Sequence, residues 1–302
     1  MASRFFLTIS GLLFVISSLG QKQSYKVIAI GSYNCENLFD TEDDPNKKDD
    51  DFTPNGSYAY TEAVYKHKLH NIATVIQQMG TDVTPDGAAI IGLVEVENDK
   101  VLKDLVAQPE IKDRHYQFAW FYTSDERGIS TALLFNPKYF RMQSASPVRV
   151  PMESIGQSRP TRDILYVSGI LANDTIHILV NHWPSKSGGE QVSAPYRKLA
   201  ATIAKKISDS LLNINPNNKI IIMGDLNDNP TSEAVLDVLE AKQDKQDLKL
   251  TDIYNPWITM YKQGYGTENY RGEWNLIDQI MVTGSFIINN NNCLLYTSDT
   301  AD

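Results

Sequence analysis

The sequence predicts an α/β or α+β domain, because short apolar runs typical of buried strands alternate with two stretches of helical apolar spacing. The chain has 302 residues, 42% of them hydrophobic, which is enough to bury a large core. The motifs that suggest chemistry are spread over most of the length, which favours one domain over two.

Two helices and eight strands account for most of the pattern. The stretch from Thr61 to Met79 carries apolar residues near helical spacing, and so does the stretch from Ser193 to Leu212, where Pro195 suits a first turn. We expect strands near residues 26–33, 88–94, 116–122, 129–135, 163–171, 174–181, 219–224 and 274–283.

The segment KIIIMGDLNDNP contains the strongest single motif. Ile220 to Met223 is too apolar for a surface strand, and Gly224 lets the backbone turn and expose the polar residues after it. Asp225 and Asn227 come next, so a carboxylate and an amide can reach the same ion or substrate oxygen if the backbone stays extended. Taken alone, the motif is equally compatible with an ordinary Asp/Asn turn.

The same pattern recurs at three other predicted strand ends. KVIAIGSYN ends in Asn34, AAIIGLVEVEN contains Glu95, and TIHILVNHWPS contains His182. Ligand sites in α/β proteins collect at strand ends, so we expect these side chains to converge on one cleft. EWNLIDQIMV places Asp278 within an apolar strand, where an ionised carboxylate is costly unless it is paired or bound to a metal.

These motifs, in this order, resemble the endonuclease/exonuclease/phosphatase superfamily of deoxyribonuclease I-like phosphoesterases. The resemblance runs from about Lys26 to Val282 and implies a four-layer sandwich: two packed mixed β-sheets flanked by helices. It implies that Glu95 is the principal metal ligand with Asn34 beside it. It also implies that Asp225 activates or orients the attacking water and that Asn227 donates to the phosphoryl group. His182 would bond the phosphate or act as an acid, and Asp278 would orient a catalytic histidine, either His182 or one apparently lost.

Hard divalent cations suit this set of oxygen donors. We expect Mg²⁺ or Mn²⁺, with Ca²⁺ as an alternative, and the sequence offers no Cys/His cluster that would favour zinc. The acidic stretch from Asp40 to Asp51 lacks EF-hand spacing, so a solvated loop is the preferred interpretation. The candidate phosphate contacts are Ser185, Lys186, Arg127, Arg162 and Arg197.

The end of the sequence departs from the family pattern. Members of the family carry a late Ser-Asp-His triplet, whereas the last histidine here is His182. Cys293 to Ser298 resembles a translated sequencing adapter, so we expect a reading frame cut short, with the family domain at 21–292 and a non-native tail at 293–302. The loss of a catalytic histidine predicts reduced activity for this polypeptide. Loss of a core strand, which would leave a sheet edge unpaired, predicts poor solubility.

The start of the sequence predicts an export signal. Residues 1–20 contain Arg4, an apolar stretch from Phe5 to Val15, and small residues before Gln21. We therefore expect a periplasmic or extracellular monomer with no membrane span after signal cleavage; an uncleaved anchor is the alternative.

Three functional interpretations remain open at this point. The first is an exported nuclease acting on DNA or RNA, and the second is a phosphatase or phosphodiesterase acting on inositol phosphates, lipids or other small esters. The third is a catalytically dead exported binding protein. The net charge of -9 modestly favours the second over the first, because binding to polyanions rests on Lys and Arg.

Overall fold

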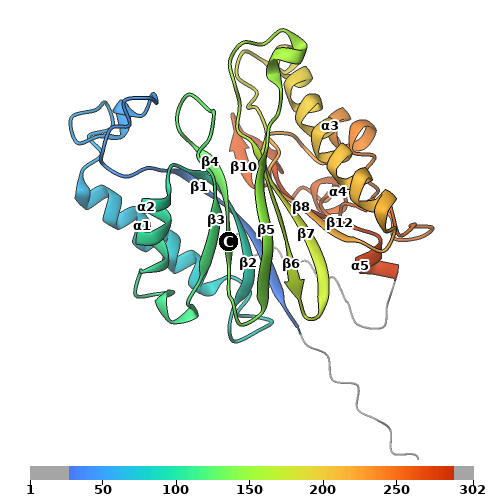
Figure 1. The fold of residues 1–302 in the computed structure, drawn as a ribbon. Helices are drawn as coiled ribbons and strands as arrows, with labels where there is room; N and C mark the ends of the chain where they lie inside the picture. The colour runs from blue at the N-terminus through green and yellow to red at the C-terminus, as the bar shows by residue number, and fades with distance from the viewer. Residues whose placement is uncertain (1–26, 289–302) are drawn as a thin grey trace, which may run out of the picture.

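Two mixed β-sheets face each other, and helices cover the outer face of each sheet (Figure 1). The computed structural model describes residues 27–288. The predicted signal peptide at 1–20 and the predicted tail at 293–302 therefore lie outside the described residues.

The first sheet is built by the N-terminal half of the described chain. Its order is β1-β2-β4-β3, with β1 parallel to β2 and the other pairs antiparallel. The helices α1 and α2 pack on its outer face (Figure 1). The bounds are β1 Ala29–Leu38, α1 Glu62–Gln78, β2 Ala88–Val96, α2 Asp99–Val106, β3 Gln117–Trp120 and β4 Ser130–Phe135.

The second sheet is built by the C-terminal half, in the order β5-β6-β7-β8-β12-β9. Within it β7 and β8 are parallel and the other neighbours are antiparallel. The strands are β5 Phe140–Val148, β6 Ile164–Leu171, β7 Asp174–His182, β8 Lys219–Asp225, β9 Ile253–Tyr254 and β12 Asp278–Thr283. The helices are α3 Glu190–Ile214, the π-helix η4 Ala234–Val238, α4 Trp257–Lys262 and α5 Ser285–Ile288.

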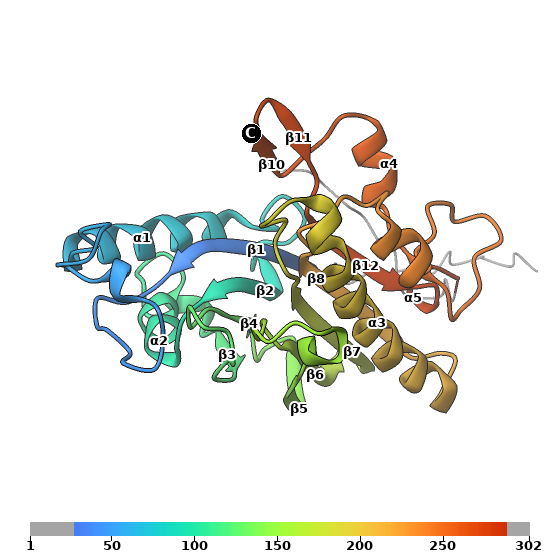
Figure 2. The same cartoon turned by 90° about the horizontal axis from the view of Figure 1, so that it is seen from above.

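Shorter elements complete the described chain. Three 3₁₀ helices lie in connecting loops: η1 Asp50–Phe52, η2 Lys112–Arg114 and η3 Met152–Ile155. A separate two-stranded hairpin, β10 Glu268–Tyr270 with β11 Glu273–Asn275, stands apart from both large sheets (Figure 2).

Three hydrophobic clusters separate the four layers. Residues alternate between the two faces of each strand, so Ile91 of β2 packs toward α1 whereas Ile90 packs between the sheets. In β8, Ile221 faces the space between the sheets and Ile222 packs toward α3. The predicted four-layer sandwich is therefore confirmed, with one apolar layer at each of its three interfaces.

The two predicted helices are present. The first begins at Glu62, directly after Thr61, whose side chain accepts a hydrogen bond from the backbone N of Val64 and caps the helix. The second begins earlier than expected, at Glu190, and Pro195 lies inside it near the N-terminal end. The predicted strand at 274–283 is wrong in its first part, because β12 begins only at Asp278 and residues 273–275 belong to the hairpin.

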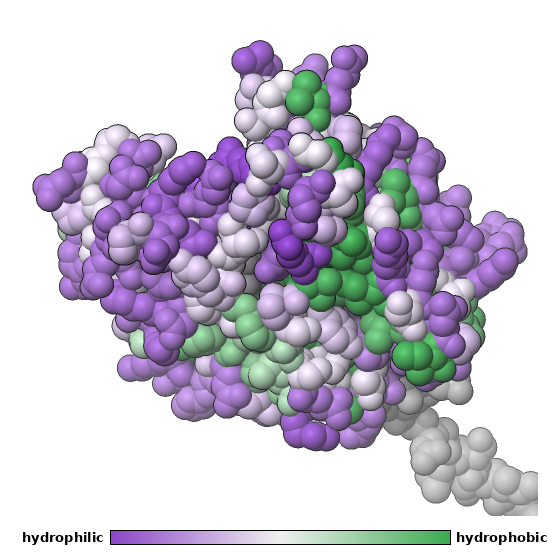
Figure 3. Space-filling model, turned by 45° about the horizontal axis from the view of Figure 1, so that its top comes forward, coloured by the Kyte–Doolittle hydropathy of each residue, from purple (hydrophilic) through white to green (hydrophobic). Residues whose placement is uncertain are grey.

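The surface is largely hydrophilic over the face seen in Figure 3, with hydrophobic side chains gathered in a band near its centre. Among residues 27–288, no helix combines the length and the apolar character that crossing a membrane requires.

Candidate active site

The register of three strands of the second sheet brings acidic and imidazole side chains together. His182 at the end of β7 pairs with Asp225 at the end of β8, and Asp225 pairs with Asp278 at the start of β12. Asp225 and His182 are buried, at 3% and 4% exposure. One end of this sheet therefore carries a row of three ionisable residues.

The first sheet contributes two more residues to the same place. Asn34 of β1 donates a hydrogen bond from Nδ2 to Oδ2 of Asp225, at 3.2 Å. Glu95 of β2 lies with its Oε1 3.8 Å from Nε2 of His182, and that Nε2 is also 3.8 Å from Oδ2 of Asp225. The structure thus brings Asn34, Glu95, His182 and Asp225 together across the two sheets.

Glu95 occupies an unusual backbone conformation. Its φ is +62°, in the left-handed region that non-glycine residues rarely adopt, and it sits where the pairing of β2 with β4 shifts register between Val94 and Val96. The bulge re-aims the glutamate side chain away from the alternation of the strand. Backbone strain of this kind clusters at functional sites.

The charges in the site perturb one another. Burial, followed by the nearby carboxylate of Asp278, raises the pKa of Asp225 to about 7. Burial also raises the pKa of Asp278. For His182, burial and then the positive charges of Arg162 and Arg127 hold the pKa well below its ordinary value, so the imidazole is neutral at physiological pH.

Asn227 closes the turn after β8 with φ of +49°. Its backbone N donates to Oδ1 of Asp225 at 2.7 Å, and its side-chain Nδ2 donates to the backbone carbonyl of Trp183 at 2.9 Å. The first bond fixes Asp225 and the second fixes the side chain of Asn227, whose Nδ2 keeps a second hydrogen that can be donated to a phosphoryl oxygen.

Asp278 lies opposite Asp225 in the pairing of β12 with β8, and within residues 27–288 no hydrogen bond joins it to His182. Its backbone N donates to Oγ1 of Thr267 at 3.3 Å, and its Oδ1 is buried without a hydrogen-bond partner among the described residues. Among residues 27–288, therefore, no direct contact between Asp278 and a histidine supports the orienting role that the family resemblance implies.

Two of the predicted phosphate-binding cations flank this cluster. Arg162 is 8% exposed, forms an ion pair with Asp125 at 3.6 Å and donates from Nη2 to the carbonyl of Trp183 at 3.0 Å. Arg127 is partly buried, and its charge depresses the pKa of His182 together with that of Arg162. Positive charge is thus concentrated beside the imidazole.

The other predicted phosphate contacts differ in their surroundings. Ser185 is exposed, and Lys186 pairs with Glu190 at 3.2 Å and lies 4.0 Å from Oδ1 of Asp228. Arg197 requires a correction, because it is fully buried and bonds internally to Asp228 at 3.0 Å, to Ser193 at 2.9 Å and to Glu190. A guanidinium engaged in this way holds α3 against the loop after β8 and is not available to a phosphate.

Sequence reasoning missed the residues that support the site. Asn181 is fully buried; its Nδ2 donates to the carbonyl of Leu179 at 3.0 Å, and its Oδ1 accepts from Nε1 of Trp183 at 3.1 Å. Asp125, the partner of Arg162, lies in the loop before β4. The only signal in the sequence was a polar residue beside His182 in an apolar strand.

Only part of the acidic stretch from Asp40 to Asp51 is the solvated loop that we expected. Asp40 and Asp49 are buried, at 4% and 2% exposure. Asp40 accepts from the backbone N of Glu42 and from Nδ2 of Asn98, while Glu97 accepts from the backbone N of Asp40 at 2.6 Å. These bonds tie the loop to the segment that directly follows β2, the strand that carries Glu95.

The donors at the site suit a hard divalent cation. Glu95 offers a carboxylate, the Oδ1 of Asn34 accepts one bond from the backbone N of Glu36 and keeps a second lone pair, and Oδ1 of Asp278 is unpartnered among the described residues. Within residues 27–288, however, no three His, Cys, Asp or Glu side chains already form a ready-made cluster for an ion.

Known proteins resemble this chain in sequence profile and in fold. Residues 29–302 match the sequence profile described as the Endonuclease/Exonuclease/phosphatase family. No curated protein is significantly similar in sequence to this chain.

Solved structures share the fold at low sequence identity. The mannosyl-6-phosphatase of Bacteroides thetaiotaomicron is 15% identical, with a TM-score of 0.53 over 85% of both chains. A humanized TDP2 from D. rerio is 13% identical, with a TM-score of 0.50 over 85% of this chain and 83% of that chain.

Proposed function

Because this chain belongs to the endonuclease/exonuclease/phosphatase family, we propose that it is a divalent-cation-dependent hydrolase of phosphate esters. The family is one of phosphoester hydrolases, and the finer assignment rests on the residues of the site. The observation that carries it is the meeting of Asn34, Glu95, His182 and Asp225 across the two sheets.

Glu95 and Asn34 are the residues that would hold the cation, for which we propose Mg²⁺ or Mn²⁺ because carboxylate and amide oxygens select hard ions. When bound, such an ion supplies Lewis-acid polarisation of the phosphoryl oxygen. Its positive charge also suits a site in which Asp225 and Asp278 face each other.

Asp225 is proposed to accept the proton of the attacking water. A general base works best when its pKa is near the operating pH, and burial beside Asp278 raises the pKa of Asp225 to about 7. The backbone N of Asn227 holds Oδ1 of this carboxylate, so Oδ2 is the atom directed toward Asn34 and the water.

The phosphoryl group would lie between His182 and the two arginines. A neutral His182 can donate one hydrogen bond without repelling the neighbouring cations, and Arg162 and Arg127 supply the charge that complements the phosphate. The amide of Asn227 is the further proposed contact. Ser185 and Lys186 remain proposals as outer contacts, because both lie on the loop after β7.

A phosphodiesterase of the nuclease type is the first candidate. A phosphomonoesterase is the second, supported by the acidic net charge of -9 and by the fold shared with the mannosyl-6-phosphatase. Export to the periplasm or the extracellular space remains a proposal that rests on the first 20 residues of the sequence.

The decisive experiment measures turnover by the purified full chain. Plasmid DNA, RNA and p-nitrophenyl phosphate are incubated with Mg²⁺, with Mn²⁺, with Ca²⁺ and with chelator. We expect metal-dependent hydrolysis that Glu95→Gln abolishes and that the surface control Glu62→Gln, on the first turn of α1, retains. Binding of a phosphoester without turnover under every metal condition would favour the inactive binding protein instead.

A further inference from the structure

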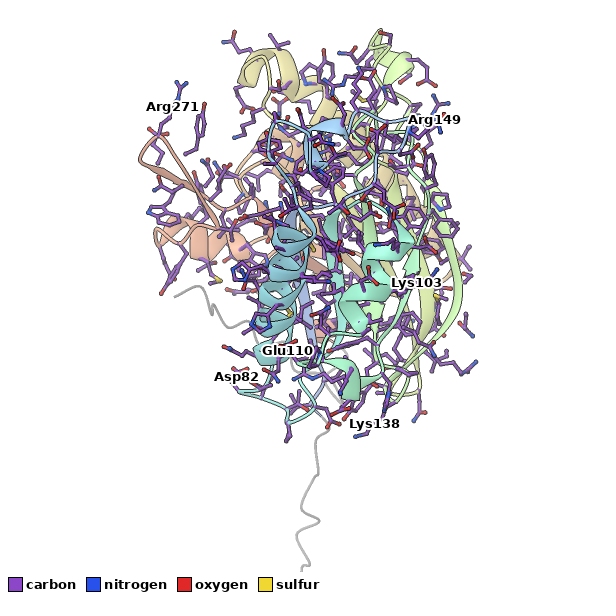
Figure 4. All side chains as sticks on the ribbon, turned by 90° about the vertical axis from the view of Figure 1, so that its left-hand side faces the viewer. Asp82, Lys103, Glu110, Lys138, Arg149 and Arg271 are labelled. Carbon is purple, nitrogen blue, oxygen red and sulfur yellow. The ribbon has the colours of Figure 1, made fainter. Side chains whose placement is uncertain are left out.

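The hairpin formed by β10 and β11 exposes large aromatic side chains next to the site. Tyr270 and Trp274 are each 57% exposed, and Tyr265, just before the hairpin, is 48% exposed. Arg271 lies at the tip and points away from the body of the protein (Figure 4). Isolated exposed aromatic residues need no explanation, but three within ten residues on one projecting arm do.

The base of this hairpin is bonded directly to the catalytic segments. Oγ1 of Thr267 accepts from the backbone N of Ile277 at 3.2 Å and from that of Asp278 at 3.3 Å. Asn275 accepts at Oδ1 from Nδ2 of Asn229, at 2.9 Å, in the loop that follows Asn227. The arm therefore rises from the rim of the site.

The register of the hairpin decides which face is turned to the site. Glu268 pairs with Asn275 and Tyr270 pairs with Glu273, so these four side chains share one face. Asn275 contacts Asn229, and Glu268 is close enough for its charge to raise the pKa of Asp278 beyond the effect of burial. The face that carries Tyr270 thus contacts the loop after β8 at its base, through Asn275.

Trp274 lies on the opposite face. It pairs with Asn269 and packs over Gly266, where an added Cβ would lie 2.9 Å from Cβ of Trp274. Its ring packs against Gly266 at the base of the hairpin. Trp274 therefore offers a matched control for Tyr270, with equal exposure on the same arm.

The tip holds Tyr270 in a defined setting. Arg271 and Gly272 both have positive φ, +54° and +89°, as a tight two-residue hairpin turn requires. The guanidinium of Arg271 lies 5.1 Å from the centroid of the Tyr270 ring. Tyr270 is two residues beyond Glu268, which is about 7 Å of extended strand.

We propose that Tyr270, with Arg271 beside it, forms a stacking platform for a nucleobase attached to the phosphoester in the site. The proposal rests on the proposed hydrolase function and specifies its substrate as a nucleotide or a short single strand. Aromatic rings and arginine planes bind bases by stacking, which is tolerant of sequence.

The charges around the platform limit the size of this substrate. Glu268 and Glu273 flank Tyr270 on the same face, and the chain carries a net charge of -9. Additional phosphates along that face would meet carboxylates rather than cations. A long duplex, whose binding depends on neutralising many phosphates, is therefore disfavoured against a substrate with one base in contact.

The test uses two matched substrates and four proteins. A dinucleotide and the same phosphodiester lacking the base on one side are hydrolysed by the full chain and by Tyr270→Ala, Tyr270→Phe and Trp274→Ala. We expect the unsubstituted chain to prefer the base-bearing substrate about 10-fold in kcat/KM, the selectivity expected of one stacked base. Tyr270→Ala should remove the preference by lowering kcat/KM for the base-bearing substrate, whereas Tyr270→Phe and Trp274→Ala should keep the preference.

Four outcomes distinguish a failure of this proposal from a failure of the proposed function. Equal turnover of both substrates by the unsubstituted chain, or a preference that survives Tyr270→Ala, overturns the platform and leaves the hydrolase intact. If neither substrate is cleaved, the affinities of the chain for adenosine monophosphate and for ribose 5-phosphate are compared by calorimetry. Equal affinity for the two ligands would contradict the stacking platform. If the nucleotide binds more tightly and Tyr270→Ala removes this difference, the platform is supported although the proposed hydrolase function is contradicted.

Discussion

Asp225 and Asp278 face each other in the antiparallel pairing of β8 and β12, so two carboxylates share one largely buried position. Two buried carboxyl groups on paired residues cannot both ionise at low cost, and the pKa of each is raised by burial and by its acidic neighbours. A site built this way favours a proton or a cation between its carboxylates.

Replacing Asp225 should therefore remove most of the activity. We expect Asp225→Asn to lower kcat by roughly 100-fold to 10,000-fold, the range for losing a positioned acid/base group. The surface control Asp209→Asn, whose carboxylate pairs with Lys205 on α3, should retain full activity. Steady-state kinetics at saturating substrate, with circular dichroism to verify folding, makes the comparison; equal rates for both variants would contradict the role of Asp225.

The buried ion pair between Arg197 and Asp228 should matter for stability. Arg197→Met leaves Asp228 buried without its guanidinium, which costs about 3–5 kcal/mol when one partner of a buried pair is removed. The adjacent Lys198→Met, which breaks a partly exposed pair with Glu233, should cost less than about 1 kcal/mol. Urea unfolding measures both values. A double variant with Asp228→Asn should recover part of the loss, and full additivity would show that the pair is not coupled.

His177 should make the protein less stable in mild acid. Burial lowers its pKa from the ordinary value of 6.5, while the ring accepts or donates one bond with the hydroxyl of Tyr166 at 2.8 Å. Since the unfolded chain binds the proton more readily, stability is full above pH 6.5 and is lost as the pH falls toward the lower folded pKa.

The comparison with His177→Gln isolates this effect. His182 also has a lowered pKa and contributes in the same direction, but it is present in both proteins. Urea unfolding at pH 7.5 and at pH 5 should show a smaller loss in His177→Gln than in the unsubstituted chain. The same loss in both proteins would mean that His177 does not titrate on unfolding.

Gly92 sets how closely the two sheets approach. A Cβ added there would lie 2.5 Å from Sδ of Met223 in the facing sheet and 3.3 Å from a methyl group of Val180. We expect Gly92→Ala to destabilise the fold by about 1–3 kcal/mol through overpacking. The double variant with Met223→Val should recover stability in thermal unfolding; a neutral Gly92→Ala would show that Met223 moves aside freely.

The architecture followed from the sequence where apolar strands end in polar groups. Asn34, Glu95, His182 and Asp225 were each identified by that pattern, and the structure places them together. Hydrophobic burial governs both the strand pattern and the sheet packing, which explains why local sequence was sufficient there.

Other features depend on partners that local sequence does not specify. The edge strand β5 was missed because most of its side chains are exposed and show no apolar alternation. The hairpin strands have only three residues each and are polar. Arg197 was assigned to phosphate because its helix position was visible but its buried partner Asp228 was not.

The division of the chain between the sheets has a practical consequence. Every strand of one sheet precedes Asn136 and every strand of the other follows it, yet the cluster takes Asn34 and Glu95 from one side and His182 and Asp225 from the other. If the chain were cut at the exposed Lys138, each of the two fragments would carry only two of these four residues. Recovered hydrolysis on mixing them would then serve as a complementation signal for their reassembly.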